Sequence, residues 1–111
     1  MKKGEVWRVR FPSSPGRAQA GERPAVIVHN DSSLTALPVV LVVPFTSQLA
    51  AARFTGTLTV QPDGVNGLST QSVALVFQLG AQDKRNFLHR IGEIDTPTMD
   101  AILAIVRQLI L

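Results

Sequence analysis

An arginine and a threonine stand beside two apolar segments of the chain. Arg23 comes directly before Pro24 and the apolar run at residues 25–28 (AVIV). A second apolar run, at residues 39–43 (VVLVV), leads into the hydroxyl and amide side chains of residues 46–48 (TSQ). Continuous apolar runs of this length predict buried strands. Because a planar guanidinium close to neutral hydrogen-bonding groups suits a phosphodiester, the sequence predicts a phosphate site between a strand start and a strand end.

Most other catalytic arrangements are missing from the sequence. The chain has no cysteine, which excludes disulfides and thiolate metal sites. Its two histidines, His29 and His89, are far apart and not in a ligand spacing, and residues 67–71 (GLSTQ) lack the second glycine of a nucleophile elbow. No paired carboxylates and no glycine-rich phosphate loop stand out. We therefore expect chemistry without a metal, a cofactor or a covalent intermediate.

Cleavage of RNA meets that requirement, because the substrate brings its own nucleophile, the 2′-hydroxyl. Arg23 is expected to stabilise the charge that develops on the phosphate rather than to carry protons, since the arginine pKa lies far above neutrality. Thr46 is expected to hydrogen-bond the scissile phosphate or to orient the 2′-hydroxyl. DNA lacks this hydroxyl and is not expected to be a substrate.

Length, composition and charge set the frame for this site. The chain has 111 residues, 45% of them hydrophobic, which predicts one globular domain spanning residues 1–111. Two lysines open the chain with no apolar stretch behind them, so we expect a cytoplasmic protein with no membrane segment. Residues 1–53 carry seven basic and three acidic groups, a net +4, which is compatible with a phosphate-binding face and also with an ordinary solvated surface.

Hydrophobic periodicity predicts a mainly β protein that ends in a helix. Thr96 is a suitable N-cap, and Pro97 suits the first helical position. A long loop rich in proline, glycine and serine spans residues 12–21. Strands are expected at residues 5–11, 25–28, 39–43, 57–60, 73–79 and 88–94. An apolar helical stripe is formed by Met99, Ile102, Leu103, Val106, Leu109 and Ile110. This order of elements predicts a small barrel-like sheet capped by the helix.

Four segments of the chain resemble the MazF/PemK family of toxin endoribonucleases. Residues 4–7 (GEVW) are similar to the family's opening G-[DE]-hydrophobic-aromatic strand. Residues 16–24 resemble its G-S-E-Q-x-G-x-R-P loop. Residues 43–47 (VPFTS) resemble its hydroxyl-bearing strand end, and residues 67–78 its G-L-x-x-x-S-x-x-x-x-x-Q segment. The resemblance implies the fold of the MazF, PemK and CcdB families, an SH3-like small barrel with a C-terminal helix packed on the sheet.

The resemblance also implies a function. It implies the toxin of a type II toxin–antitoxin system, a metal-independent and sequence-specific endoribonuclease that cleaves single-stranded mRNA and so inhibits translation and growth. Its products would be a 2′,3′-cyclic phosphate and a 5′-hydroxyl, and no cofactor is implied. The implied partners are a second copy of the chain, with the RNA groove near the dimer interface, and an acidic MazE-like antitoxin whose extended tail blocks that groove. By position, Arg23 and Thr46 would be catalytic, and the residues around the RNA would be Arg17, Gln19, Ser47, Gln48 and Gln78.

Three positions depart from the family pattern. Ala18 stands where many relatives have Glu, Arg17 replaces a small residue, and Phe77 stands where Asp is common. Two alternatives therefore stay open beside the ribonuclease. One is a catalytically inactive RNA-binding barrel. The other is a CcdB-like gyrase poison, although such poisons resemble one another in a C-terminal Trp, whereas the single Trp of this chain is Trp7.

Overall fold

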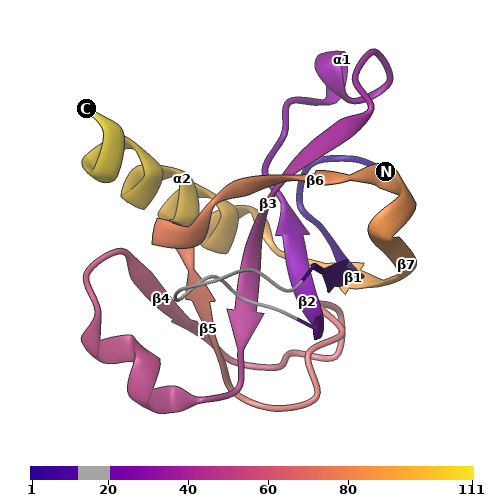
Figure 1. Cartoon of the computed structure of the whole chain (residues 1–111). Helices are drawn as coiled ribbons and strands as arrows, with labels where there is room; N and C mark the ends of the chain where they lie inside the picture. The colour runs from indigo at the N-terminus through magenta and orange to yellow at the C-terminus, as the bar shows by residue number, and fades with distance from the viewer. Residues whose placement is uncertain (13–20) are drawn as a thin grey trace.

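The computed structural model describes residues 1–12 and 21–111, and the strands in this part of the chain pair antiparallel throughout. They form a seven-stranded sheet in the order β4-β5-β3-β2-β1-β7, with β6 also paired to β3 (Figure 1). The strands are β1 (Glu5–Phe11), β2 (Gly21–Ile27), β3 (Val39–Thr46), β4 (Thr57–Val60), β5 (Ser72–Leu75), β6 (Gly80–Asp83) and β7 (Phe87–Glu93). The helices are α1 (Asp31–Leu34), α2 (Thr96–Ile110) and the 3-10 helices η1 (Leu49–Arg53), η2 (Val76–Gln78) and η3 (Lys84–Asn86).

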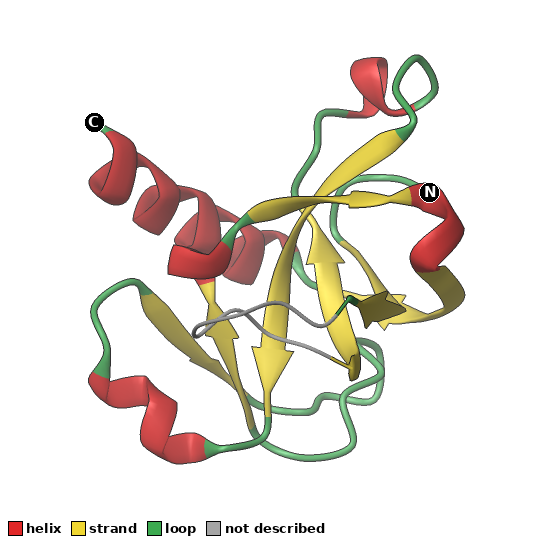
Figure 2. Cartoon of the chain, in the orientation of Figure 1, coloured by secondary structure: helices red, strands yellow, loops and turns green. Residues whose placement is uncertain are grey.

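The expected mainly β fold, an SH3-like small barrel with a C-terminal helix on the sheet, is confirmed. Figure 2 shows how the strands surround the middle of the molecule while α2 lies along one side. The described residues include no helix that is both long enough and apolar enough to cross a membrane.

Two apolar clusters fill opposite faces of the β1–β2 ribbon. Val6 faces Val26 in one cluster, which α2 closes with the buried side chains of Met99 and Ile102. The other cluster contains Val9, Phe11, Ala25, Ile27, Leu34, Val40 and Val42. Side chains alternate between faces along a strand, so each of these strands contributes to both clusters. Burial on both faces explains the continuous apolar run at residues 25–28, although Leu41 in the second run is exposed.

The predicted single strand at residues 73–79 is wrong, because β5 ends at Leu75, η2 follows, and the next strand, β6, begins only at Gly80. Both pair with β3, yet β3 advances only from Val42 to Phe45 while the facing segment advances from Gly80 to Ala74. The facing segment therefore has three residues too many, and η2 takes them up as a turn. Such a bulge re-aims side chains: Val76 is buried and Phe77 is 41% exposed.

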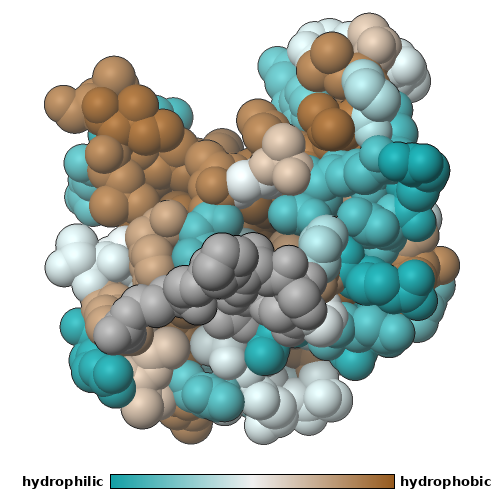
Figure 3. Space-filling model, in the orientation of Figure 1, coloured by the Kyte–Doolittle hydropathy of each residue, from teal (hydrophilic) through white to brown (hydrophobic). Residues whose placement is uncertain are grey.

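Helix α2 differs from the prediction at both ends. Asp95 is the N-cap and accepts a hydrogen bond from the Thr98 backbone at 2.8 Å, so Thr96 is already the first helical residue. At the other end Leu109 and Ile110 are 43% and 68% exposed, because the helix extends past the sheet on which its first turns pack. Figure 3 shows this end of α2 as a hydrophobic surface at the upper left.

A nearly buried carboxylate ties β1 to β7. Glu5 accepts hydrogen bonds from Trp7 Nε1 at 3.0 Å, from the Lys2 backbone at 3.1 Å and from Arg90 Nε at 3.1 Å. Burial raises the pKa of Glu5, but these three hydrogen bonds outweigh it and hold the pKa below the ordinary value of 4.5. The ionised carboxylate therefore stabilises the fold.

We expect Glu5→Gln to lower the free energy of unfolding at neutral pH by about 1–3 kcal/mol, since the amide leaves the buried donors poorly satisfied. A group whose pKa is lowered on folding contributes its stability above the unfolded-state pKa and loses it as the pH falls through the folded-state pKa. The difference between the two proteins should thus shrink below about pH 4 in urea unfolding. Glu93→Gln is the control, because Glu93 also pairs with Arg90, at 3.5 Å, but is 41% exposed. An undiminished difference in acid would contradict the prediction.

Candidate active site

Two prolines determine where β2 and β3 part. The ladder between these strands runs from Ile27–Val42 to Ala25–Pro44 and ends there. Neither Pro24 nor Pro44 has an N–H to donate to a ladder. Strand β2 nevertheless continues along β1 as far back as Gly21. Arg23 therefore lies inside a strand, and the prediction that it stands at a strand start is wrong.

The parting strands leave Arg23 and Thr46 on either side of a cavity. Continuing the β2–β3 register by two residues beyond Ala25–Pro44 puts Arg23 opposite Thr46, on the same face of the sheet. Both residues line a cavity of about 230 Å³. Thr46 is the last residue of β3 and is 5% exposed. The predicted meeting of this pair is thus present in the structure.

Arg23, which lines this cavity, has an unsatisfied hydrogen-bond donor. Its Nε is buried and has no hydrogen-bond partner among the described residues. The adjacent carboxylate of Glu22 also lines the cavity, but it pairs with Arg8 Nε at 3.7 Å and Arg10 Nη2 at 3.8 Å. A buried guanidinium donor without a partner is suited to an anionic ligand, because such a ligand removes the cost of desolvating it.

The Thr46 hydroxyl is oriented by the backbone that follows it. Its Oγ1 accepts a hydrogen bond from the Gln48 backbone N–H at 3.2 Å. A hydroxyl has one donor and two acceptor sites, so this contact leaves the O–H able to donate to a ligand oxygen. Arg23 and Thr46 can therefore both donate to one phosphate group.

A loop that was not among the predicted site residues closes the cavity with hydroxyl groups. Ser69, Thr70 and Ser72 line it together with Leu68 and Ser47. Hydrogen bonds fix the loop, since Asn66 Nδ2 donates to the Gln61 carbonyl at 2.8 Å and Asn66 Oδ1 accepts from the Leu68 backbone at 3.0 Å. Asp63 Oδ1 accepts from the Val65 and Asn66 backbones.

A glycine sets how closely this loop approaches β7. Gly67 has φ +75°, and a Cβ there would lie 2.0 Å from the Ile91 carbonyl oxygen. The sequence offered one signal for this region, the run of hydroxyl residues after Gly67-Leu68, but nothing that placed it beside Arg23.

A second, larger cavity of about 590 Å³ also includes Thr46 in its wall. Gln48 and Gln78 supply amide groups to it, and the rest of its described lining is apolar: Ala51, Phe54, Leu75 and Phe77. Two cavities of different character thus meet at Thr46, one polar with Arg23 and one apolar with aromatic side chains.

The predicted site residues are distributed over these two cavities. Arg23, Thr46 and Ser47 line the polar cavity, and Thr46, Gln48 and Gln78 line the apolar one. The predictions for Arg17 and Gln19, and the departure at Ala18, lie outside the described residues.

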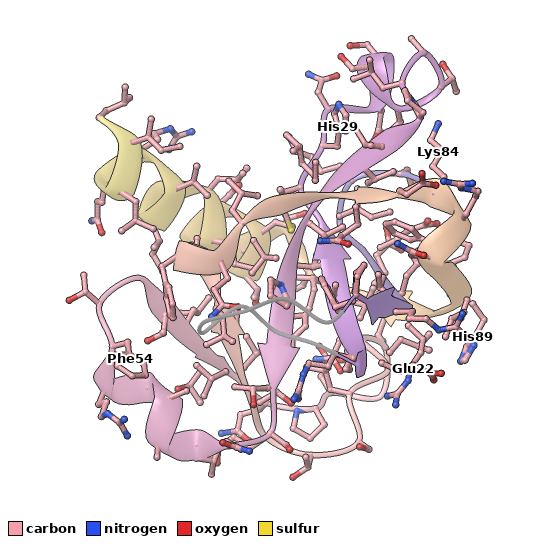
Figure 4. All side chains as sticks on the ribbon, in the orientation of Figure 1. Glu22, His29, Phe54, Lys84 and His89 are labelled. Atoms are coloured by element: carbon pink, nitrogen blue, oxygen red, sulfur yellow. The ribbon has the colours of Figure 1, made fainter. Side chains whose placement is uncertain are left out.

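The histidines are not part of either cavity. Buried His29 accepts a hydrogen bond from the Leu41 backbone at 3.4 Å, and His89 lies exposed on β7 opposite Arg8. Figure 4 shows both away from Phe54, which lies at the η1 end of the molecule. Across residues 1–12 and 21–111, no three His, Cys, Asp or Glu side chains gather to hold a metal ion.

Comparison with known proteins places this geometry in a family. A family model described as PemK-like, MazF-like toxin of type II toxin–antitoxin system matches residues 2–110. The chain is 26% identical over 102 residues to endoribonuclease EndoA of Bacillus subtilis (strain 168), covering 92% of this chain and 87% of EndoA.

Solved structures show the same fold. MazF of Deinococcus radiodurans superimposes with a TM-score of 0.82 at 19% identity, covering 98% of this chain and 94% of that one. An endoribonuclease in complex with its cognate antitoxin, from a mycobacterial species, gives 0.76 at 18% identity, covering 97% and 92%. Matched along almost its whole length, this protein belongs to the PemK/MazF-like family of toxins of type II toxin–antitoxin systems.

Proposed function

We propose that this protein is an endoribonuclease that cleaves single-stranded RNA at specific sequences, without a metal ion. The observation that carries the proposal is the pair of Arg23 and Thr46 on one cavity, with the buried Arg23 Nε free of any partner among the described residues. The endoribonuclease activity named for the relative EndoA supports it. Cleavage of mRNA would inhibit translation and growth, which agrees with the membership of this protein in a toxin family.

The chemistry uses the RNA's own 2′-hydroxyl. Its oxygen attacks the adjacent phosphorus, the bond from phosphorus to the 5′-oxygen breaks, and the products are a 2′,3′-cyclic phosphate and a 5′-hydroxyl. The 2′-hydroxyl gives up one proton, and the leaving 5′-oxygen gains one. Arg23 stabilises the charge on the phosphoryl oxygens between these two events, and the Thr46 O–H donates to the same phosphate. Ser47, Gln48 and Gln78 would contact the flanking nucleotides, as would Arg17 and Gln19.

The proposed partners fit the surface of the molecule. The basic excess of residues 1–53 favours RNA and an acidic antitoxin. The mycobacterial relative was solved with its cognate antitoxin, which supports an antitoxin partner here. The exposed apolar end of α2 at Leu109, Ile110 and Leu111 supports a homodimer, because a second copy would remove this surface from water. A protein with these partners would act in the cytoplasm.

We expect the wild-type protein to cut a long single-stranded RNA at discrete sites in EDTA, leaving 5′-hydroxyl ends. Arg23→Ala should slow the cleavage by about 10²–10³-fold, because it removes a donor aimed at the developing charge. Arg23→Lys is the matched control, since it keeps the charge but loses the planar fork, and its rate should lie between the other two. Primer extension and end labelling measure the cuts, and circular dichroism checks the fold. Unchanged cleavage by Arg23→Ala would overturn the assignment of this residue.

A single 2′-deoxy nucleotide at a mapped cut site should abolish cleavage there, because the attacking hydroxyl is gone. Affinity for the substituted RNA should change little, since the phosphates remain. Thr46→Val should reduce the cleavage rate, while Thr46→Ser should retain most of it, because serine keeps the O–H donor. Gel analysis of the cuts and fluorescence anisotropy of the bound RNA provide the two readouts. RNA binding without any product from the unsubstituted RNA would instead indicate an inactive RNA-binding barrel.

A further inference from the structure

Two phenylalanines from different segments form an exposed aromatic pair. The rings of Phe54 and Phe77 are 5.9 Å apart at 63°, an edge-to-face arrangement. Both residues stay exposed, by 39% and 41%. Neither side chain is needed to fill the cores of the sheet, because neither is among the residues of the two apolar clusters. An exposed aromatic pair of this kind is a candidate binding surface.

The backbone holds this pair in place. Phe54 ends η1, where its N–H donates to the Ala51 carbonyl at 3.1 Å, and Phe77 sits in η2, where its N–H donates to the Gly56 carbonyl at 3.1 Å. Gly56 has φ +79°, and a Cβ there would lie 3.2 Å from the Phe77 Cβ. The glycine thus permits the close approach of the two segments, and the pair is organised before any ligand arrives.

The pair lies beside the proposed phosphate site. Phe54 and Phe77 line the apolar cavity, whose wall includes Thr46 from the polar cavity. No carboxylate is among the described residues of the apolar cavity, and the Arg53 guanidinium lies 4.6 Å from the Phe54 ring centre. Gln48 and Gln78, which carry amide groups, also line this space. The surface therefore combines aromatic faces, hydrogen-bonding amides and a nearby cation.

We propose that Phe54 and Phe77 form a stacking site for one unpaired nucleobase next to the scissile phosphate. Aromatic faces bind bases by stacking, an adjacent cation favours the polyanionic strand, and amides can bond base edges. These features together favour a nucleotide over an apolar protein side chain, which would gain nothing from the amides or from Arg53. The inference rests on the proposed function for the identity of the ligand, but it makes a separate statement about binding.

The test is a chemical double-mutant cycle that measures affinity instead of cleavage. The probe is a short 2′-O-methyl RNA, which lacks the attacking hydroxyl. If the cleavage experiment identifies a cut sequence, the probe carries that sequence. If it does not, the probe is an adenosine homopolymer. Phe54→Leu and Phe77→Leu should each weaken the binding of this probe by about 5- to 100-fold, as measured by fluorescence anisotropy. Phe77→Trp, which keeps an aromatic face, should bind the probe about as tightly as wild type. In a series of probes, an abasic nucleotide is placed at each position in turn, and one of these probes should bind wild type more weakly than the others. For that probe, Phe77→Leu should cause no further loss of affinity, because the base that it would stack on is absent.

Phe87→Leu is the matched control, because Phe87 forms the other edge-to-face pair among the described rings, with Trp7 at 6.0 Å, away from both cavities. It should leave RNA affinity unchanged. Equal RNA affinity of wild type and both leucine variants would overturn the stacking site even if wild type cleaves RNA. Loss of dimerisation in sedimentation equilibrium with unchanged RNA affinity would also overturn it and would assign the pair to a protein contact. Failure of the proposed function has a different signature, namely no cleavage by wild type, while the affinity cycle still reports on stacking.

Discussion

The end of the β2–β3 ladder is the constraint on which the site depends. Strands that pair to their last residue leave no room between them, whereas β2 and β3 separate after Ala25–Pro44. Beyond that point β3 keeps a partner only on its other edge, where Phe45 and Thr46 pair with Ala74 and Val73 of β5. Arg23 stays with β1, where it faces Val9. The two site residues are therefore held by different neighbours, and the space between them is part of the fold.

The unpaired Nε of Arg23 lowers the stability of the ligand-free protein, as is typical of a ligand-binding site. A buried N–H without a partner destabilises a fold by about 1–3 kcal/mol. The nearest carboxylate in sequence, Glu22, also lines the polar cavity and is shared by Arg8 and Arg10. These pairs engage the Glu22 carboxylate, and the buried Arg23 Nε has no hydrogen-bond partner among the described residues. The Arg23 Nε is therefore left to donate to a ligand.

Local features allowed much of this architecture to be predicted. Alternation predicts β1 and β4 with the bounds that the structure has, and the residues beside the two apolar runs predict the Arg23–Thr46 pair. The prediction of one strand at residues 73–79 is wrong although apolar residues do alternate along this segment of the sequence. The three extra residues are an excess only relative to β3, which a single strand's pattern cannot reveal.

The other differences have the same non-local origin. Asp95 and Thr96 are both good N-caps, and only the structure shows which one the first turn uses. The apolar stripe of α2 predicts one packed face, but the length of sheet beneath the helix decides that Leu109 remains exposed. Ser69 and Thr70 reach the cavity through a loop held by Asn66 and Gly67, and no spacing in the chain relates that loop to Arg23.

The departure at Phe77 acquires a physical meaning from the bulge. In a continued strand Phe77 would share a face with buried Val73 and Leu75, and an aromatic ring there would need space in the core. The turn at η2 directs Phe77 outward, where its ring contacts that of Phe54 at the end of η1. The Phe77 N–H also donates to the Gly56 carbonyl. The two rings then form an apolar surface in the cavity that Thr46 also lines. The cation and the aromatic pair thus line separate cavities, so in the proposed function substrate preference can change at the aromatic pair without altering Arg23.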